Sequence, residues 1–226
     1  MGSNNDISLK ALAKINLGLD VVRRREDGYH EVRMIMQTIQ LYDRLDIKRT
    51  QEPGIQIQTN LSFLPVNENN LIYKAAKLLM DEFSITDGVS VKLDKRIPVA
   101  AGMAGGSTDA AAMLIGVNRL FSLGLTKRQL MERGVQIGAD VPYCIMRGTA
   151  LAEGIGEALS PLPPMVKCPV LIAKPSISVS TKFVYQNLKL DDTTIHPDID
   201  RLIDDIKAKN LHDLSLIHIS EPTRPY

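Results

Sequence analysis

A run of small residues, PVAAGMAGGSTDAAA between Pro98 and Ala112, is the segment best suited to bind an anion. A predicted strand ends before it, and an Ala-rich helix is expected over residues 107–121. Glycines let the backbone approach a bulky ligand, and a helix start offers unpaired N–H groups and the positive end of its dipole. The run matches neither the P-loop nor GxGxxG. It therefore predicts either a phosphate site of another kind or an ordinary tight turn. The side chain of Ser107 could cap the helix, or its hydroxyl could help to hold magnesium on the phosphates.

Two polar residues interrupt an apolar strand near the N-terminus, in the segment ALAKINLGL. Lys14 and Asn16 are two positions apart, so their side chains should point to the same face of the strand. A lysine in such a place must reach solvent, pair with an acid or line a site. Exposure on an edge strand and participation in a site both remain open from the strand alone.

Asp140 lies in the segment GADVP, between the end of a predicted helix and a proline. Aspartate is common in turns and helix caps, which is one interpretation. Combined with a phosphate loop and a lysine, the carboxylate becomes a candidate base for a hydroxyl nucleophile.

A Tyr-His pair follows the polar turn that ends in Asp27-Gly28. Tyr29 and His30 could stack on a flat heterocycle and donate a hydrogen bond to it. The alternative is that both side chains pack at the start of a strand.

The pattern of apolar residues predicts the elements that must position these side chains. Helices are expected at 69–83 with Asn69 or Asn70 as the N-cap, at 107–121, at 126–134, near Thr181 and at 198–209. Strands are expected at 7–22, 32–41, 45–49, 55–58, 89–93 and 170–173, with further short strands after Asp140. Without a steady βαβ rhythm, this mixture favours an α+β fold.

The composition narrows the class of protein. Apolar residues make up 44% of the 226 positions, and 27 basic residues balance 26 acidic ones, so no global field favours nucleic acid or an anionic membrane. The chain shows no apolar run long enough for a membrane span and no signal-peptide pattern, which predicts a cytoplasmic protein. Cys144 and Cys168 lie far apart and are expected to be buried, reduced thiols.

The four segments occur together in one order, and this combination resembles the GHMP kinases. The loop at 98–112 marks that superfamily. Lys14, the DGYH element and GADVP are similar to its members whose acceptor is 4-diphosphocytidyl-2-C-methyl-D-erythritol, in non-mevalonate isoprenoid precursor biosynthesis. The similarity runs from about Ile7 to His212 through the stretches AKINLGLDV, REDGYHEV, NENNLIYKAAKLL, LDKRIPVAAGMAGGSTDAAA and IGADVPYCIMRGTALAEGIGE.

The resemblance implies a two-domain α+β GHMP kinase fold. Its parts would be an N-terminal domain over 6–160, similar to domain 2 of ribosomal protein S5, and a partial ferredoxin-like domain over 165–214, with a boundary at the proline-rich joint 161–164. It also implies an enzyme that uses ATP and Mg²⁺ to phosphorylate the acceptor's 2-hydroxyl group, without nucleic-acid or membrane partners, as a monomer or weak homodimer.

The resemblance further implies roles for individual residues. Asp140 would accept the proton of the acceptor hydroxyl, and Lys14 would keep that carboxylate ionised. The residues implied to bind the acceptor substrate are Asn16, Tyr29, His30 and Tyr185. Those implied to bind ATP are Asn70, Lys95, Gly102, Ala104, Gly105, Gly106, Ser107 and Thr108. No metal site held by the protein itself is implied.

The chain departs from the family in one respect. Its relatives carry a third, Gly-Ser-Gly-rich motif near the C-terminus, whereas residues 215–226 here end in EPTRPY, which cannot continue a helix. We expect these residues to be a non-family tail, and the chain to lack part of its second domain. Impaired activity and exposed apolar surface are then expected. Another GHMP kinase, the related decarboxylase, and a non-catalytic nucleotide- or RNA-binding module are the alternatives.

Overall fold

The computed structural model describes residues 5–174, 181–188, 190 and 194–212. The chain forms two compact units. Unit 1 contains residues 1–13, 39–99 and 103–146, and unit 2 contains residues 14–38, 100–102 and 147–226. Helices and strands mix in both, which confirms the predicted α+β class. The domain limits inferred from the sequence remain a prediction, and the predicted tail lies outside the described residues.

Two long strands, β1 (Asp6–Arg24) and β2 (His30–Thr50), pair with each other and run through both units. In unit 1, β2 pairs antiparallel with β4 (Gly88–Asp94), which pairs in parallel with β3 (Ile55–Thr59). In unit 2, β2 pairs antiparallel with β5 (Thr149–Glu153), which pairs antiparallel with β6 (Ala158–Pro161). The sequence predicted two strands at 32–41 and 45–49, and this was wrong. Asp43 interrupts the apolar pattern there, yet its side chain is fully buried and hydrogen-bonded, so the strand continues through it.

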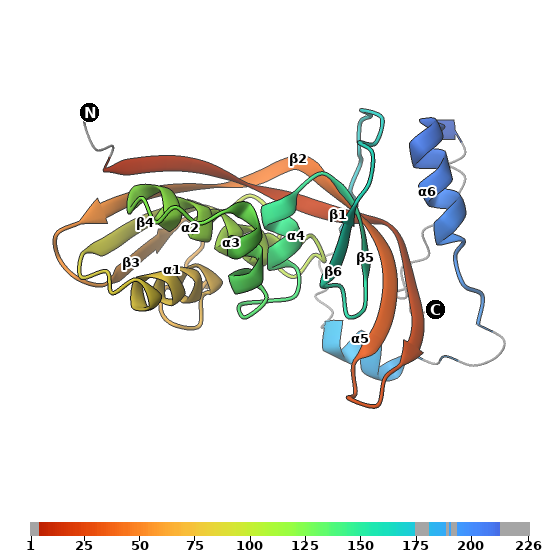
Figure 1. Cartoon of the computed structure of the whole chain (residues 1–226), viewed down its shortest axis with the longest axis horizontal. Coiled ribbons are helices and arrows are strands. Elements are labelled where there is room, and N and C mark those ends of the chain that lie inside the picture. The colour runs from red at the N-terminus through yellow and green to blue at the C-terminus, as the bar shows by residue number, and fades with distance from the viewer. Residues whose placement is uncertain (1–4, 175–180, 189, 191–193, 213–226) are drawn as a thin grey trace. The chain divides into compact units, whose positions relative to one another are not determined.

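Four helices of unit 1 lie on one face of strands β2, β4 and β3 (Figure 1). They are α1 (Leu71–Glu82), α2 (Gly105–Leu120), α3 (Lys127–Gly134) and α4 (Val141–Met146). Asn70 caps α1 as predicted, and Thr126 with Gln129 forms a capping box at α3. A Cβ atom on Gly116 would lie 2.3 Å from Ile47 Cδ1, so a glycine is needed where α2 meets the sheet.

Helix α4 is not predicted from the sequence, which indicated only short strands after Asp140. Pro142 lies in the first turn of this helix, where its missing N–H group breaks no hydrogen bond within the helix. The N–H of Cys144 donates to the carbonyl of Asp140 at 3.0 Å, which closes the first turn. A proline that suggested a turn therefore starts a helix.

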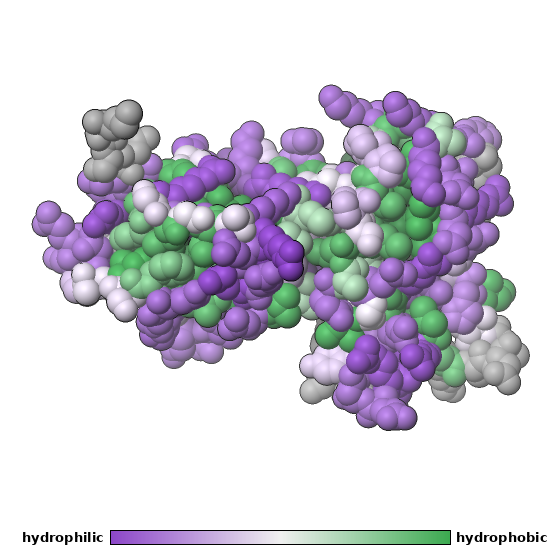
Figure 2. Space-filling model, viewed as in Figure 1, coloured by the Kyte–Doolittle hydropathy of each residue, from purple (hydrophilic) through white to green (hydrophobic). Residues whose placement is uncertain are grey.

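Unit 2 is built around an amphipathic helix, α6 (Ile199–Ala208), whose N-cap is Asp198. Its apolar side packs against β1 and β2, and its hydrophilic side faces outward (Figure 2). The buried members of this core are Leu17, Ile35, Ile199, Leu202, Ile203 and Ile206. Arg33 on β2 holds the helix through paired hydrogen bonds of 2.9 and 2.6 Å to Asp200.

Two further predictions are settled in unit 2. Helix α5 (Thr181–Asn187) lies where a helix was expected. The strand predicted at 170–173 was wrong, because these residues form no ladder and Leu171 is 97% exposed. An apolar run becomes a strand only where a partner edge is available.

Among the described residues, no helix is long and apolar enough to cross a lipid bilayer. Both cysteines are free thiols; Cys144 is buried as predicted, whereas Cys168 is only half-buried.

Candidate active site

The glycine-rich loop leads into α2, as the sequence predicts, but the helix begins earlier than expected. Its first residue is Gly105, and Ala104 is the N-cap with a left-handed φ of 54°. No side chain caps the helix from this position, so the prediction that Ser107 could be the cap is wrong. Gly102, which belongs to unit 2, also has a positive φ of 69°. An uncapped helix start after a glycine turn is suited to an anionic ligand.

The side chains at this helix start differ in orientation. Ser107 is half-buried, and Gly106 is exposed. Thr108 is 1% exposed, and its hydroxyl donates to the backbone carbonyl of Leu12 on β1 at 2.8 Å. The Thr108 hydroxyl therefore joins α2 to the sheet, and its predicted contact with ATP remains a prediction.

Lys95, at the end of β4, is buried beneath the loop. Its ammonium group forms ion pairs with Asp43 and, at 2.8 Å, with Asp109 of α2. Burial raises the pKa of the Asp109 carboxyl well above its usual range, against the lowering effect of Lys95 beside it. The geometry thus directs the ammonium of Lys95 into the interior, and a contact with ATP remains a prediction.

Asn70, also predicted to contact ATP, has both ends of its side chain occupied in unit 1. The Oδ1 atom accepts from the N–H of Ile72 at 2.9 Å, and Nδ2 donates to the carbonyl of Pro65 at 2.7 Å. A Cβ atom on Gly106 would lie 3.3 Å from Leu71 Cδ1, so the start of α1 lies against the start of α2. Asn70 is therefore near the loop and shapes the chain beside it.

Asp140 lies between α3 and α4 in unit 1, and its side chain is half-buried. A Cβ atom on Gly138, two residues earlier, would lie 4.0 Å from Ser107 Oγ. The segment GADVP and the start of α2 are consequently neighbours, although they are far apart in the sequence. Unit 1 therefore brings the segment of the candidate base close to the start of α2, where the glycine-rich loop ends.

Lys14 and Asn16 lie in unit 2, on one face of β1 as the alternation predicts. Lys14 is only 6% exposed, and its ammonium donates to Asn16 Oδ1 at 3.1 Å. An amide oxygen carries no net charge, so this hydrogen bond does not pair Lys14 with an acid, and its role in the site remains a prediction. The solvent-facing interpretation of Lys14 is wrong.

The three aromatic residues predicted to recognise a base are in unit 2. The His30 and Tyr185 rings have centroids 5.1 Å apart and are tilted by 36°. Tyr29 is 61% exposed, and its N–H donates to Asp27 Oδ1 at 3.1 Å, which shapes the turn. His30 of β2 and Tyr185 of α5, widely separated in sequence, thus form one aromatic group, and Tyr29 lies in the turn directly before β2.

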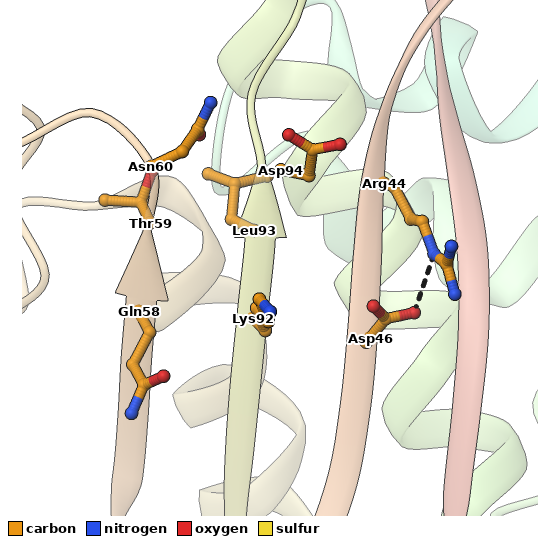
Figure 3. Close-up of a pocket in the computed structure, with 8 residues that line it drawn as sticks. All are labelled: Arg44, Asp46, Gln58, Thr59, Asn60, Lys92, Leu93 and Asp94. Carbon is orange, nitrogen blue, oxygen red and sulfur yellow. Dashed lines mark hydrogen bonds and ion pairs between the residues drawn. The ribbon is translucent and has the colours of Figure 1, made fainter.

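A separate groove of about 400 Å³ lies in unit 1, along β2 and the C-terminal ends of β3 and β4 (Figure 3). Its charged residues are Arg44, Asp46, Lys92 and Asp94, and Arg44 donates to Asp46 at 2.9 Å. The opposite charges balance, so the groove does not favour an anion. None of the predicted site residues lines it.

The fold and the loop together define a class, the GHMP kinases. Residues 70–148, which include the loop and Asp140, match the sequence profile of the GHMP kinases N terminal domain. The crystal structure of homoserine kinase from Cytophaga hutchinsonii matches with a TM-score of 0.73, covering 99% of this chain and 75% of that one. At 17% identity, this likeness shows the shared fold alone.

Two other comparisons identify the family within this class. A crystal structure of 4-(cytidine 5'-diphospho)-2C-methyl-D-erythritol kinase matches with a TM-score of 0.77 at 33% identity, over 89% of this chain and 72% of that one. The 4-diphosphocytidyl-2-C-methyl-D-erythritol kinase of Lachnoclostridium phytofermentans is 62% identical over 209 residues, which are 92% of this chain and 72% of the relative. The chain belongs to the 4-diphosphocytidyl-2-C-methyl-D-erythritol kinase family, which confirms the resemblance seen in the sequence.

Sequence reasoning missed two buried acids, Asp43 and Asp109. Asp109 stands alone among small residues in an Ala-rich helix, whereas Asp43 is followed by Arg44 and Asp46 and is not singled out by its neighbours. An unexplained charge in an apolar pattern is the signal that singled out Lys14. Applied throughout the chain, this signal would have found Asp109, but neither Asp43 nor the fact that both acids share Lys95 as a partner.

Proposed function

We propose that this chain transfers the γ-phosphoryl group of ATP to the 2-hydroxyl group of 4-diphosphocytidyl-2-C-methyl-D-erythritol. The observation that carries the proposal is the 62% identity, over 209 of the chain's residues, to a relative named 4-diphosphocytidyl-2-C-methyl-D-erythritol kinase. The start of α2 and the segment of Asp140, which are neighbours in unit 1, support it, as does the aromatic group of His30 and Tyr185 in unit 2.

The reaction asks the protein mainly for positioning and charge stabilisation. In our proposal, backbone N–H groups at the start of α2 hold the phosphates of ATP. The acceptor hydroxyl gives its proton to the Asp140 carboxylate, while its oxygen forms a bond to the γ-phosphorus. The bond between that phosphorus and the bridging oxygen of ADP breaks. Lys14 would keep Asp140 ionised and polarise the hydroxyl, with Asn16 holding the ammonium in place.

Magnesium is proposed as the partner of the nucleotide. The described residues contain no group of three or more His, Cys, Asp or Glu side chains placed to hold a metal ion. We infer that Mg²⁺ arrives on the phosphates of ATP and that the half-buried Ser107 hydroxyl is its candidate protein ligand. The ion would neutralise charge that develops on the phosphates. The cytoplasm, which supplies ATP, is the expected compartment, and a monomer or weak homodimer the expected state.

The direct test is ADP release with 4-diphosphocytidyl-2-C-methyl-D-erythritol as the acceptor, with homoserine and mevalonate as comparison acceptors. We expect turnover with the cytidine compound alone. Saturable, Mg²⁺-dependent ATP binding, measured in parallel by calorimetry, separates an inactive kinase from a protein without a nucleotide site. Faster turnover with homoserine or mevalonate would contradict the proposed acceptor.

Replacing Tyr185 by alanine is expected to weaken acceptor binding selectively. A base stacked on an aromatic ring gains about 1–3 kcal/mol, which corresponds to a rise in KM of roughly 5- to 150-fold for the acceptor. The KM for ATP should change less than about twofold. Phe183→Ala is the matched control, since this 61% exposed aromatic lies on the same helix and has no proposed role. Equal effects of the two substitutions on acceptor KM would contradict the role of Tyr185.

A further inference from the structure

A single buried carboxylate holds the chain where β4 leads into the glycine-rich loop. Asp43 Oδ1 accepts the backbone N–H of Arg96 at 2.5 Å and that of Ile97 at 2.7 Å. The second oxygen, Oδ2, accepts from the ammonium of Lys95. Asp43 is fully buried, so these bonds are shielded from competing water. Three consecutive residues at the entry to the loop thus depend on one side chain from β2.

The ammonium of Lys95 carries this connection to the other end of the loop. It pairs with Asp109 Oδ2 at 2.8 Å, near the start of α2. Gly105, the first residue of that helix, lies against the same ammonium, because a Cβ atom there would be 2.8 Å from Lys95 Nζ. The residues that enter the loop, up to Ile97, and those that leave it, from Gly105, therefore share one buried support.

Asn60 directly follows β3 (Figure 3) and holds the backbone of Lys95 through two hydrogen bonds. Its Oδ1 accepts the Lys95 N–H at 2.8 Å, and its Nδ2 donates to the Lys95 carbonyl at 3.1 Å. Asn60 is exposed, so it can be replaced without opening the core. Asp43, Lys95, Asp109 and Asn60 form the loop anchor.

The charges in the loop anchor are unequal, with two carboxyl groups around one ammonium. Asp109 Oδ1 is buried and, within the part of the chain that the structure describes, has no hydrogen-bond partner. Burial and the nearby Asp43 both raise the pKa of the Asp109 carboxyl. An asparagine at 109 would mimic a protonated carboxyl, whereas Asp43 must remain an acceptor on both oxygens.

We propose that the loop anchor is a positioning device for the nucleotide, holding the two ends of the glycine-rich loop in the conformation that binds the phosphates of ATP. This rests on the proposed function. Asp43 and Asn60 are positioning residues that act through the backbone of residues 95–97. Their loss should weaken ATP binding while the acceptor's own contacts remain.

The test compares Asp43→Asn, Asn60→Ala and Asp109→Asn with Asp81→Asn, which removes an exposed carboxylate that pairs with Lys77 on α1. An asparagine at 43 cannot accept from the backbone and the ammonium together, because one of its terminal groups is a donor. We expect Asp43→Asn to raise the Kd for ATP by at least about tenfold, and Asn60→Ala to raise it by about threefold to tenfold. Each variant loses one or two of the hydrogen bonds that hold the backbone of the loop, at about 1 kcal/mol each. Asp109→Asn should lose several-fold less affinity than Asp43→Asn, and Asp81→Asn none.

Hydrogen exchange on the same proteins separates positioning from other causes. Amides of residues 96–106 should exchange at least about tenfold faster in Asp43→Asn than in the wild type, as loss of the two accepted bonds implies. If the wild type binds no ATP, the proposed function fails, while exchange still tests the anchor. Faster exchange with unchanged ATP affinity, or unchanged exchange in a folded variant, would overturn the inference. If Asp43→Asn does not fold, Asn60→Ala decides by the same two measurements.

Discussion

Asp140→Asn should lower the rate of phosphoryl transfer by about 10³-fold and change the affinity for ATP less than about threefold. An asparagine keeps the size of the side chain but cannot accept the proton of the acceptor hydroxyl. The backbone of residue 140 retains its bond from Cys144, so α4 and its position beside the phosphate loop should persist. The loss is therefore expected in kcat rather than in nucleotide binding.

The measurement is ADP release under single-turnover conditions, together with calorimetric titration of ATP. Asp81→Asn serves as the matched control, because it removes an exposed carboxylate from α1, which has no proposed part in proton transfer. If the rate of Asp140→Asn lies within about tenfold of the wild-type rate, Asp140 is not the general base, since general-base catalysis contributes at least about 10²-fold. A parallel loss of ATP affinity would instead assign Asp140 to the binding of the nucleotide.

Lys95→Met is expected to cost about 3–5 kcal/mol of unfolding free energy, the range found when one partner of a buried ion pair is removed. The substitution preserves most of the side-chain volume but leaves Asp43 and Asp109, which are 0% and 3% exposed, without their cation. Because their positions are set by the strand and the helix, the two carboxyl groups cannot move apart into water. Urea unfolding at several pH values measures the effect.

The pH dependence of this variant has a definite sign. A carboxyl whose pKa is raised in the folded protein binds its proton more tightly there than in the unfolded chain. Its contribution to stability is complete below the unfolded value of about 4 and is lost as the pH rises through the folded value. Lys95 lowers the pKa of Asp109, so in Lys95→Met the pKa of Asp109 in the folded protein rises further. The destabilisation should therefore be larger at pH 8 than at pH 5.

Lys92→Met is the control for this prediction, since Lys92 lies three residues before Lys95, on β4, and is exposed. A change within about 0.5 kcal/mol is expected there. Equal stability losses in the two variants, or a loss that shrinks as the pH rises, would show that the ion pair does not hold the structure.

Much of this protein follows from local chemistry that the sequence already contains. Asn70 and Thr126 cap helices because their side chains reach the first free N–H groups, which needs no distant partner. The glycine-rich run before an Ala-rich helix likewise predicts the phosphate loop, because the free N–H groups at the start of a helix need no distant partner to be present. The alternation around Lys14 and Asn16 is likewise a local property, and their hydrogen bond follows from it. The family resemblance rests on these local segments and their order.

Other features depend on contacts between segments far apart in the chain. Asp43 suggested a break between two strands, yet β2 continues because the backbone of residues 96 and 97 satisfies the buried carboxylate. The apolar run at 170–173 suggested a strand, but a strand requires a partner edge that only tertiary structure can supply. The contact of Lys95 with ATP remains a prediction, but only the fold shows that its ammonium lies between two acids, 52 and 14 residues away. Burial decides whether a charged side chain contacts solvent, a substrate or other buried groups, and burial depends on how the whole chain packs.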